Sequence, residues 1–152
     1  MKLLQPLFFT ATIFLAYSCN KCKDVACTSP PPEFTFQLVD KDSGADLVAN
    51  GTFDANAIEV YSLAGQKKHG LSISDIGVAV YFTDWEIGWE AGADNKFYEL
   101  RLGSTDKIAF THHTRERNGD CCTFFELVEM SADPVETVFL NSSNTFQFQI
   151  KP

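Results

Sequence analysis

Four cysteines have a residue type and a spacing that could support disulfide or metal chemistry. Cys22 and Cys27 lie near the N-terminus, and Cys121 and Cys122 are neighbours late in the chain. In an exported chain an even number of cysteines forms disulfides by default. Four cysteines allow three pairings, and we predict two bridges that join the early pair to the late pair. A four-thiolate zinc site is the alternative, although C-x4-C with an adjacent C-C is not a usual zinc spacing.

Three carboxylates crowd one predicted turn. Asp40, Asp42 and Asp46 flank Gly44, and carboxylates at alternate positions can wrap Ca²⁺. The bidentate glutamate of an EF-hand does not follow. A solvated turn is the other interpretation, because aspartate and glycine are preferred turn residues.

Two tryptophans alternate with carboxylates in one short stretch. Trp85, Glu86, Trp89 and Glu90 lie within six residues. A loop of this composition could stack on a sugar and hydrogen-bond to it, and binding residues often lie on loops. We expect instead that one or both tryptophans close the end of the hydrophobic core, and we keep glycan binding as the alternative.

The remaining polar residues form no recognisable catalytic motif. His112 and His113 are adjacent and must diverge on a strand, and His69 stands alone; we expect all three at the surface or rim. The G-x-S-x-G elbow, the H-E-x-x-H motif and a phosphate-binding glycine loop are missing from the sequence. We therefore expect no cofactor and lean against an enzyme.

The elements that must position these residues begin with an export signal over residues 1–18. Lys2 precedes an almost wholly apolar run, which is shorter than the roughly 20 residues that span a bilayer. Small residues then lead to Cys19, which is the anatomy of a secretory signal. The stretch Leu15-Ala16-Tyr17-Ser18-Cys19 resembles a bacterial lipoprotein signal. The resemblance implies that Cys19 carries palmitate-type acyl chains, although the family prefers leucine where Ala16 stands.

A tether follows over residues 19–32. It contains two cysteines and ends in Pro30-Pro31-Pro32, and consecutive prolines favour a semi-rigid polyproline II spacer. We place the folded domain at 33–152. The chain has a net charge of −8, which argues against nucleic acid as a partner.

The domain has the pattern of an all-β protein. Period-2 alternation of apolar and polar residues predicts strands, and the turn signals between them favour a sandwich or barrel. We predict an antiparallel β-sandwich, Ig-like or a related barrel, of about eight strands. The predicted extended ranges are 34–38, 46–48, 58–61, 70–73, 78–82, 97–102, 108–110, 121–128 and 145–151. The range 133–140 fits either a helical turn or a strand.

The set of features resembles small uncharacterised lipoproteins of Bacteroidetes-type bacteria. The similarity lies in the acylated cysteine, the cysteine-containing tether and the strand-turn Leu38-Val39-Asp40-Lys41-Asp42-Ser43-Gly44-Ala45-Asp46-Leu47. It implies a cell-envelope β-sandwich and assigns no catalytic residue.

We therefore expect a protein of the bacterial cell envelope that is anchored to the outer membrane, on its periplasmic or surface side, through Cys19. The leading hypothesis is a non-enzymatic binding or structural module, whose partner is a glycan or another envelope protein. The alternatives are a carbohydrate-binding protein that uses Trp85 and Trp89, and a metal-dependent enzyme or metal-binding protein. Fold alone does not separate them.

Overall fold

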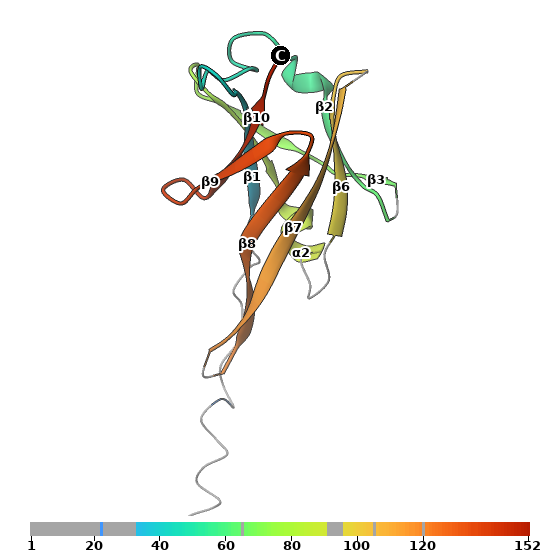
Figure 1. The fold of residues 1–152 in the computed structure, drawn as a ribbon. Coiled ribbons are helices and arrows are strands. Elements are labelled where there is room, and N and C mark those ends of the chain that lie inside the picture. The colour runs from blue at the N-terminus through green and yellow to red at the C-terminus, as the bar shows by residue number, and fades with distance from the viewer. Residues whose placement is uncertain (1–21, 23–32, 65, 91–95, 105, 120) are drawn as a thin grey trace, which may run out of the picture. The chain divides into compact units, whose positions relative to one another are not determined.

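The structure is a computed structural model, which describes residues 22, 33–64, 66–90, 96–104, 106–119 and 121–152. Strands dominate this part of the chain (Figure 1). The elements in chain order are β1 (Phe34–Asp40), η1 (Ala55–Ala57), β2 (Ile58–Ser62), β3 (Lys67–Lys68), β4 (Ser72–Asp75), β5 (Val80–Asp84), α2 (Trp85–Glu90), β6 (Lys96–Leu102), β7 (Asp106–Asn118), β8 (Thr123–Asp133), β9 (Glu136–Leu140) and β10 (Thr145–Ile150).

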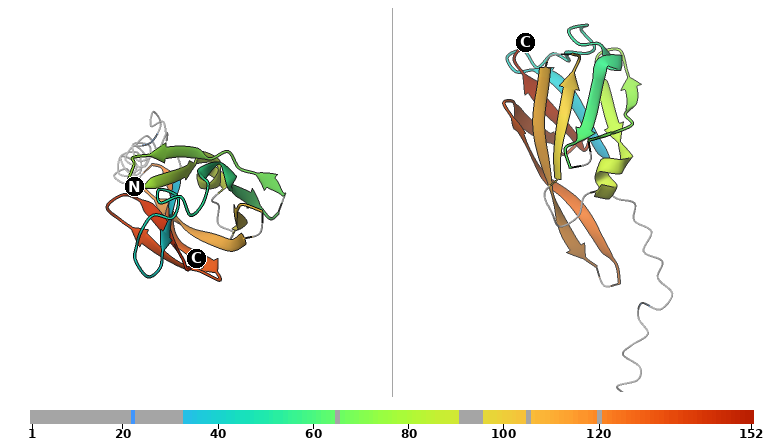
Figure 2. Two further views of the ribbon diagram at one scale, coloured as in Figure 1. Left: turned by 90° about the horizontal axis from the view of Figure 1, so that it is seen from above. Right: turned by 90° about the vertical axis from the view of Figure 1, so that its right-hand side faces the viewer.

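The strands form two five-stranded sheets. The first has the order β4-β5-β1-β10-β9, and the second has the order β3-β2-β6-β7-β8. In the right-hand view of Figure 2, β2, β6 and β7 lie in front of β1 and β10. Of the strand pairs whose register is described, β1 and β10 pair in parallel, with Phe36 opposite Phe146 and Leu38 opposite Phe148, and the other pairs are antiparallel. The first and last strands of the domain therefore lie side by side at the centre of one sheet.

Alternation along the strands fills the space between the sheets. Phe36, Leu38 and Phe148 are fully buried, and the rings of Phe36 and Phe82 stack at 5.1 Å between centroids. Tyr98 and Phe110 from the second sheet stack in the same way at 5.2 Å. Since fully burying a large apolar side chain contributes about 1.5–3 kcal/mol, each of these buried rings stabilises the sandwich.

The predicted fold class is confirmed. The protein is an all-β sandwich, and its two sheets do not close into a barrel. The range 133–140 contains the end of β8 and the strand β9, not a helical turn.

Val78 was expected on the same apolar face as Val80 and Phe82, but it precedes β5 and is 81% exposed. The reason is that Val78 lies in the turn between β4 and β5. Gly77 in this turn has a φ of 83°, so the alternation of the strand begins only after it.

The chain divides into two compact units. One contains both sheets and comprises residues 30–116 and 125–152. The other comprises residues 1–29 and 117–124, and its described residues are Cys22 and the turn between β7 and β8 with the adjoining strand ends. In the described ranges, no helix has the length and apolar character needed to cross a membrane.

Candidate functional site

The tryptophan-containing stretch forms α2, directly after β5. Asp84 caps this short helix, since its Oδ1 accepts a hydrogen bond from the backbone N–H of Ile87 at 2.8 Å. Ile87 packs into the core, whereas Trp85 is 53% exposed. Trp85 therefore does not close the end of the hydrophobic core, which was the role expected of one or both tryptophans. The side chains of Trp89 and Glu90 lie outside the described residues.

Glu86 lies beside Trp85 and is held by a lysine. Its Oε2 is 2.8 Å from Lys67 Nζ, which comes from β3, and 3.8 Å from His69 Nδ1. An exposed indole and a carboxylate that is paired with a lysine thus occupy neighbouring positions at the start of α2. Such a pair can stack against the apolar face of a sugar ring and accept hydrogen bonds from its hydroxyls.

A buried histidine and a buried aspartate face each other under this surface. The Nδ1 atom of His69 lies 3.3 Å from Asp84 Oδ2, and both side chains are completely buried. The ring of Tyr98 meets His69 edge-on at 5.6 Å. An aspartate beside a histidine can serve acid–base chemistry, but burial keeps this pair away from solvent and substrate. We therefore assign it a structural role.

The two adjacent histidines of β7 lie in opposite environments. His112 is buried and stacks on Tyr98 at 5.2 Å between ring centroids, whereas His113 is exposed. Burial lowers the pKa of His112 from 6.5 to about 4. The expectation of a surface or rim position is thus wrong for His112 and His69. The period of the strand required one histidine of the pair to face inward, and the packing of the sheets put His112 there.

The aspartates of the first turn hold the backbone. Asp40 Oδ1 accepts hydrogen bonds from the backbone N–H of Asp42 at 3.0 Å and of Ser43 at 2.6 Å, and from Ser43 Oγ at 2.7 Å. The bonds from Ser43 hold the pKa of Asp40 below its ordinary value. The Oδ2 atom of Asp42 lies 3.3 Å from Lys151 Nζ. This arrangement is an Asx turn, in which an aspartate organises its own loop.

Asp46 is buried and links three segments. Its Oδ1 accepts from the backbone N–H groups of Val48 and Ala49, both at 2.8 Å, and its Oδ2 accepts from Gln37 Nε2 at 2.9 Å and Val80 N–H at 2.8 Å. Four donors satisfy a carboxylate that is otherwise costly to bury. Among the residues the structure describes, no group of three or more His, Cys, Asp or Glu is placed to hold a metal ion.

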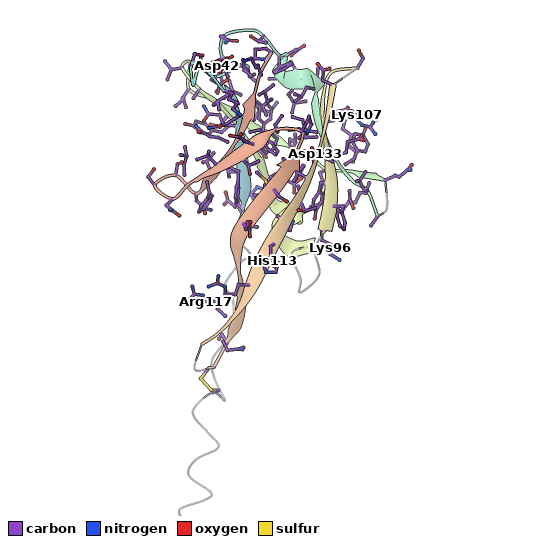
Figure 3. All side chains as sticks on the ribbon, viewed as in Figure 1. Asp42, Lys96, Lys107, His113, Arg117 and Asp133 are labelled. Carbon is purple, nitrogen blue, oxygen red and sulfur yellow. A yellow bond between two sulfur atoms is a disulfide. The ribbon has the colours of Figure 1, made fainter. Side chains whose placement is uncertain are left out.

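The cysteines form a bridge of the predicted kind. Cys22 is bonded to Cys121, which lies 99 residues later, with 5.3 Å between their Cα atoms (Figure 3). Cys122 is disulfide-bonded as well. A four-thiolate zinc site at these cysteines is therefore wrong, because sulfurs in a disulfide are not thiolates. Cys27 and Cys19 lie outside the described residues, so the second half of the predicted pairing stays a prediction.

A groove opens at the end of the sandwich where β1 and β10 finish. It has a volume of about 780 Å³, and we call it the end groove. Its apolar lining includes Phe53, Leu102, Ile108, Val135 and Ile150. The chain enters the sandwich at the opposite end of β1, since this strand runs from Phe34 to Asp40 and Lys41 N–H then bonds to the carbonyl of Ile150 at 2.8 Å.

Charged side chains surround the end groove. Its lining contains Lys41, Lys107 and Lys151 with Asp106 and Glu136. Figure 3 shows Lys107 toward the end of the sandwich at which the C-terminus lies in Figure 1. No sequence pattern predicts this grouping, because the three lysines are more than 40 residues apart along the chain. Only the parallel pairing of β1 with β10, and the turn between β6 and β7, place them together.

Comparison with known proteins gives no relative. No protein family model matches the sequence, and neither the curated proteins nor the solved structures contain a match. The geometry of the described residues therefore carries the functional argument.

Proposed function

We propose that the chain is an exported, lipid-anchored protein of the bacterial cell envelope whose sandwich is a non-enzymatic binding module. The observation that carries the proposal is the bond between Cys22 and Cys121. Disulfides persist in oxidising compartments and are rare in the reducing cytosol. Three residues before Cys22 stands Cys19, at the end of the stretch that resembles a lipoprotein signal.

The placement of reactive groups supports binding over catalysis. His69 and Asp84 are fully buried, so they cannot reach a substrate from where they lie. The end groove, in contrast, opens at the end of the sandwich opposite to the entry of the chain at Phe34.

The anchor has a direct test. Full-length protein expressed in a bacterium and extracted with detergent should have the intact mass of a chain that begins at Cys19 and carries acyl chains. It should sediment with membranes, because more than one acyl chain gives stable anchoring. Cys19→Ser should appear in the soluble periplasmic fraction with no acyl mass. Wild-type protein that retains residues 1–18, or lacks acyl mass, would contradict the anchor.

A second candidate function is carbohydrate binding at Trp85. The observation that favours it is the exposed indole, 53% accessible, which the chain follows directly with Glu86, a glutamate that forms an ion pair with Lys67. Tryptophan is enriched at binding interfaces, because it combines a large apolar ring with a hydrogen-bond donor.

Titration with soluble oligosaccharides tests this candidate. Tryptophan fluorescence should change on binding, and Trp85→Ala should weaken the affinity by about tenfold or more, as expected for a central aromatic contact. Val78→Ala is the control, since Val78 is another exposed apolar residue of the sandwich and is 81% accessible. Affinity that is unchanged in Trp85→Ala, or a fluorescence signal that ignores every glycan, would remove the candidate.

A further inference from the structure

One row of side chains crosses the outer face of the second sheet. The backbone N–H of Leu63, directly after β2, bonds to the carbonyl of Phe97 at 2.9 Å, and Phe97 lies opposite Thr111 in the pairing of β6 with β7. The hydroxyl of Thr111 in turn lies 2.8 Å from the hydroxyl of Ser131 on β8. We call these four residues the outer row. Neighbouring strands lie roughly 5 Å apart, so an aromatic ring and two hydroxyls follow one another at that spacing.

The apolar end of the outer row faces solvent. Phe97 is 58% exposed and Leu63 is 48% exposed, whereas Tyr98, on the opposite face of β6, is completely buried. The ring of Phe97 therefore contributes little to the core. Single exposed apolar residues are ordinary on a protein surface, but here two of them are cross-strand neighbours. Aromatic residues exposed in this way are enriched where proteins bind a partner.

Two hollows adjoin along the outer row. The larger has a volume of about 380 Å³ and is lined by the whole row together with Ala109 and Asp133. The smaller has a volume of about 310 Å³ and is lined by the two hydroxyl residues of the row together with His113 and Glu129. Both volumes lie at the lower end of the roughly 300–1,000 Å³ of small-molecule sites. Figure 3 labels Asp133 and His113, which line the larger and the smaller hollow respectively.

The charged groups of the hollows argue against an ionic ligand. In the described part of the chain, neither lysine nor arginine lines either hollow, so an anion finds no such partner there. The carboxylates of Glu129 and Asp133 stand on either side of Ser131, four residues apart on β8. Four residues of a strand span about 13 Å, so these two carboxylates do not converge on one cationic group.

The neutral groups of the outer row match a sugar. A sugar ring has an apolar face of C–H groups and hydroxyls around its edge, and Phe97 with Leu63 offers an exposed apolar surface for that face. The hydroxyls of Thr111 and Ser131 can each donate and accept hydrogen bonds. The strand spacing between Phe97 and Thr111 is comparable with the width of one sugar ring. A purely apolar ligand would leave the hydroxyl half of the row unused.

We propose that the outer row binds a neutral oligosaccharide. One sugar ring stacks on Phe97, and hydroxyls of the same sugar or the next one bond to Thr111 and Ser131. The inference rests on the proposal that the sandwich is a binding module, and it names the class of ligand. It uses a different surface from Trp85, which lies in α2, and it does not depend on the acyl anchor.

A glycan array with neutral, acidic and amino-sugar members supplies the probes. It is applied to the full-length protein in a detergent without a sugar head group. We expect binding to neutral glycans, and calorimetric titration with the best neutral oligosaccharide then gives its affinity. The absence of any neutral binder would overturn the proposal. Stronger binding of acidic or amino-sugar glycans than of their neutral counterparts would overturn the class of ligand.

The aromatic contact has its own variant. Phe97→Ala should weaken the affinity by about tenfold or more, as expected for a central aromatic contact. Ile73→Ala should leave it unchanged and is the matched control, because Ile73 is 45% exposed and lies on β4 in the other sheet. Thermal unfolding verifies that each variant is folded. Loss of affinity in Trp85→Ala, with Phe97→Ala unchanged, would place the glycan at α2 and overturn the outer-row site.

The hydroxyls are tested as a pair. Thr111→Val combined with Ser131→Ala should weaken the affinity by about tenfold, since one hydrogen bond is worth roughly a threefold to tenfold change. The matched control is Thr35→Val with Thr83→Val, because these two hydroxyls lie 3.2 Å apart on strands of the first sheet. An equal loss in the control pair, or no loss in the Thr111 and Ser131 pair, would contradict the proposed contacts.

The outcomes separate this inference from the proposed anchor. If no neutral glycan binds while the wild-type chain carries acyl mass at Cys19, only the outer-row site is lost. If a glycan binds through Phe97 and the acyl mass is missing, only the anchor is lost.

Discussion

Loss of the Cys22–Cys121 bridge alone should lower the free energy of unfolding by about 2 kcal/mol, whereas loss of both bridges should lower it by about 6–7 kcal/mol. The chain contains five cysteines, so an intramolecular partner of Cys122 can only be Cys19 or Cys27. Either one closes almost the same long loop as Cys22–Cys121. In the chain-entropy model the first bridge across about 100 residues is worth about 4–5 kcal/mol, and a second bridge beside it closes only a short ring.

Urea unfolding of three proteins measures this difference. They are the domain from residue 20, its Cys22→Ser/Cys121→Ser variant, and the variant with Cys27→Ser and Cys122→Ser added. Peptide mapping under non-reducing conditions identifies the partner of Cys122, which we predict to be Cys27. A loss of 4–5 kcal/mol in the first variant, with no further loss in the second, would mean that Cys122 is not bridged to the tether.

Acidification should destabilise the protein through His112. The pKa of its imidazole is about 4 in the folded chain, against an ordinary value of about 6.5 when the chain is unfolded. Between these values the unfolded state binds the proton and the folded state does not, so stability is complete above pH 6.5 and falls as the pH is lowered toward 4. A difference of about 2.5 pKa units corresponds to a loss of about 3 kcal/mol.

The physical cause is the surroundings of the ring. Tyr98 stacks on it at 5.2 Å, and Phe34 lies tilted against it at 6.4 Å. Burial is the main reason that its pKa falls, and the positive charges of His113 and Lys96 lower it further. A hydrogen bond to the residue's own backbone favours the charged ring, but the cost of burying the charge outweighs it.

His112→Phe tests this prediction, because phenylalanine keeps a planar ring against Tyr98 but cannot titrate. The free energy of unfolding of the wild type relative to His112→Phe should fall by about 3 kcal/mol between pH 7.5 and pH 4. His113→Phe is the matched control, since His113 is the exposed neighbour on the other face of β7. A parallel pH dependence of the wild type and His112→Phe would refute the assignment.

The fold class was predictable because alternation is a local property of the chain. Phe146, Phe148 and Ile150 repeat every second residue, which places them on one face of any strand they form, and all three are buried. The cysteine bridge was predictable for a different reason. With so few cysteines in a chain expected to be exported, pairing an early cysteine with a late one required only their positions.

The pairing of strands was not predictable in this way. The central strand pair of the first sheet places Phe36 opposite Phe146 and Leu38 opposite Phe148. The local pattern of neither strand indicates which strand it pairs with. The same limit applies to the candidate site. His69 and Asp84 meet because the segment after β3 and the end of β5 pack on the same core, and the lysines of the end groove come from three distant segments.

Local sequence patterns are enough to predict which segments extend, which cysteines can bridge, and the signal-like leader that suggests a compartment. Only the packing of the two sheets shows which histidine of the adjacent pair is buried, that Trp85 is exposed, and that lysines from three distant segments line one groove. The physical reason is that periodicity fixes which residues share a face of a strand, whereas the packing of the two sheets decides which face is covered and which strand ends meet.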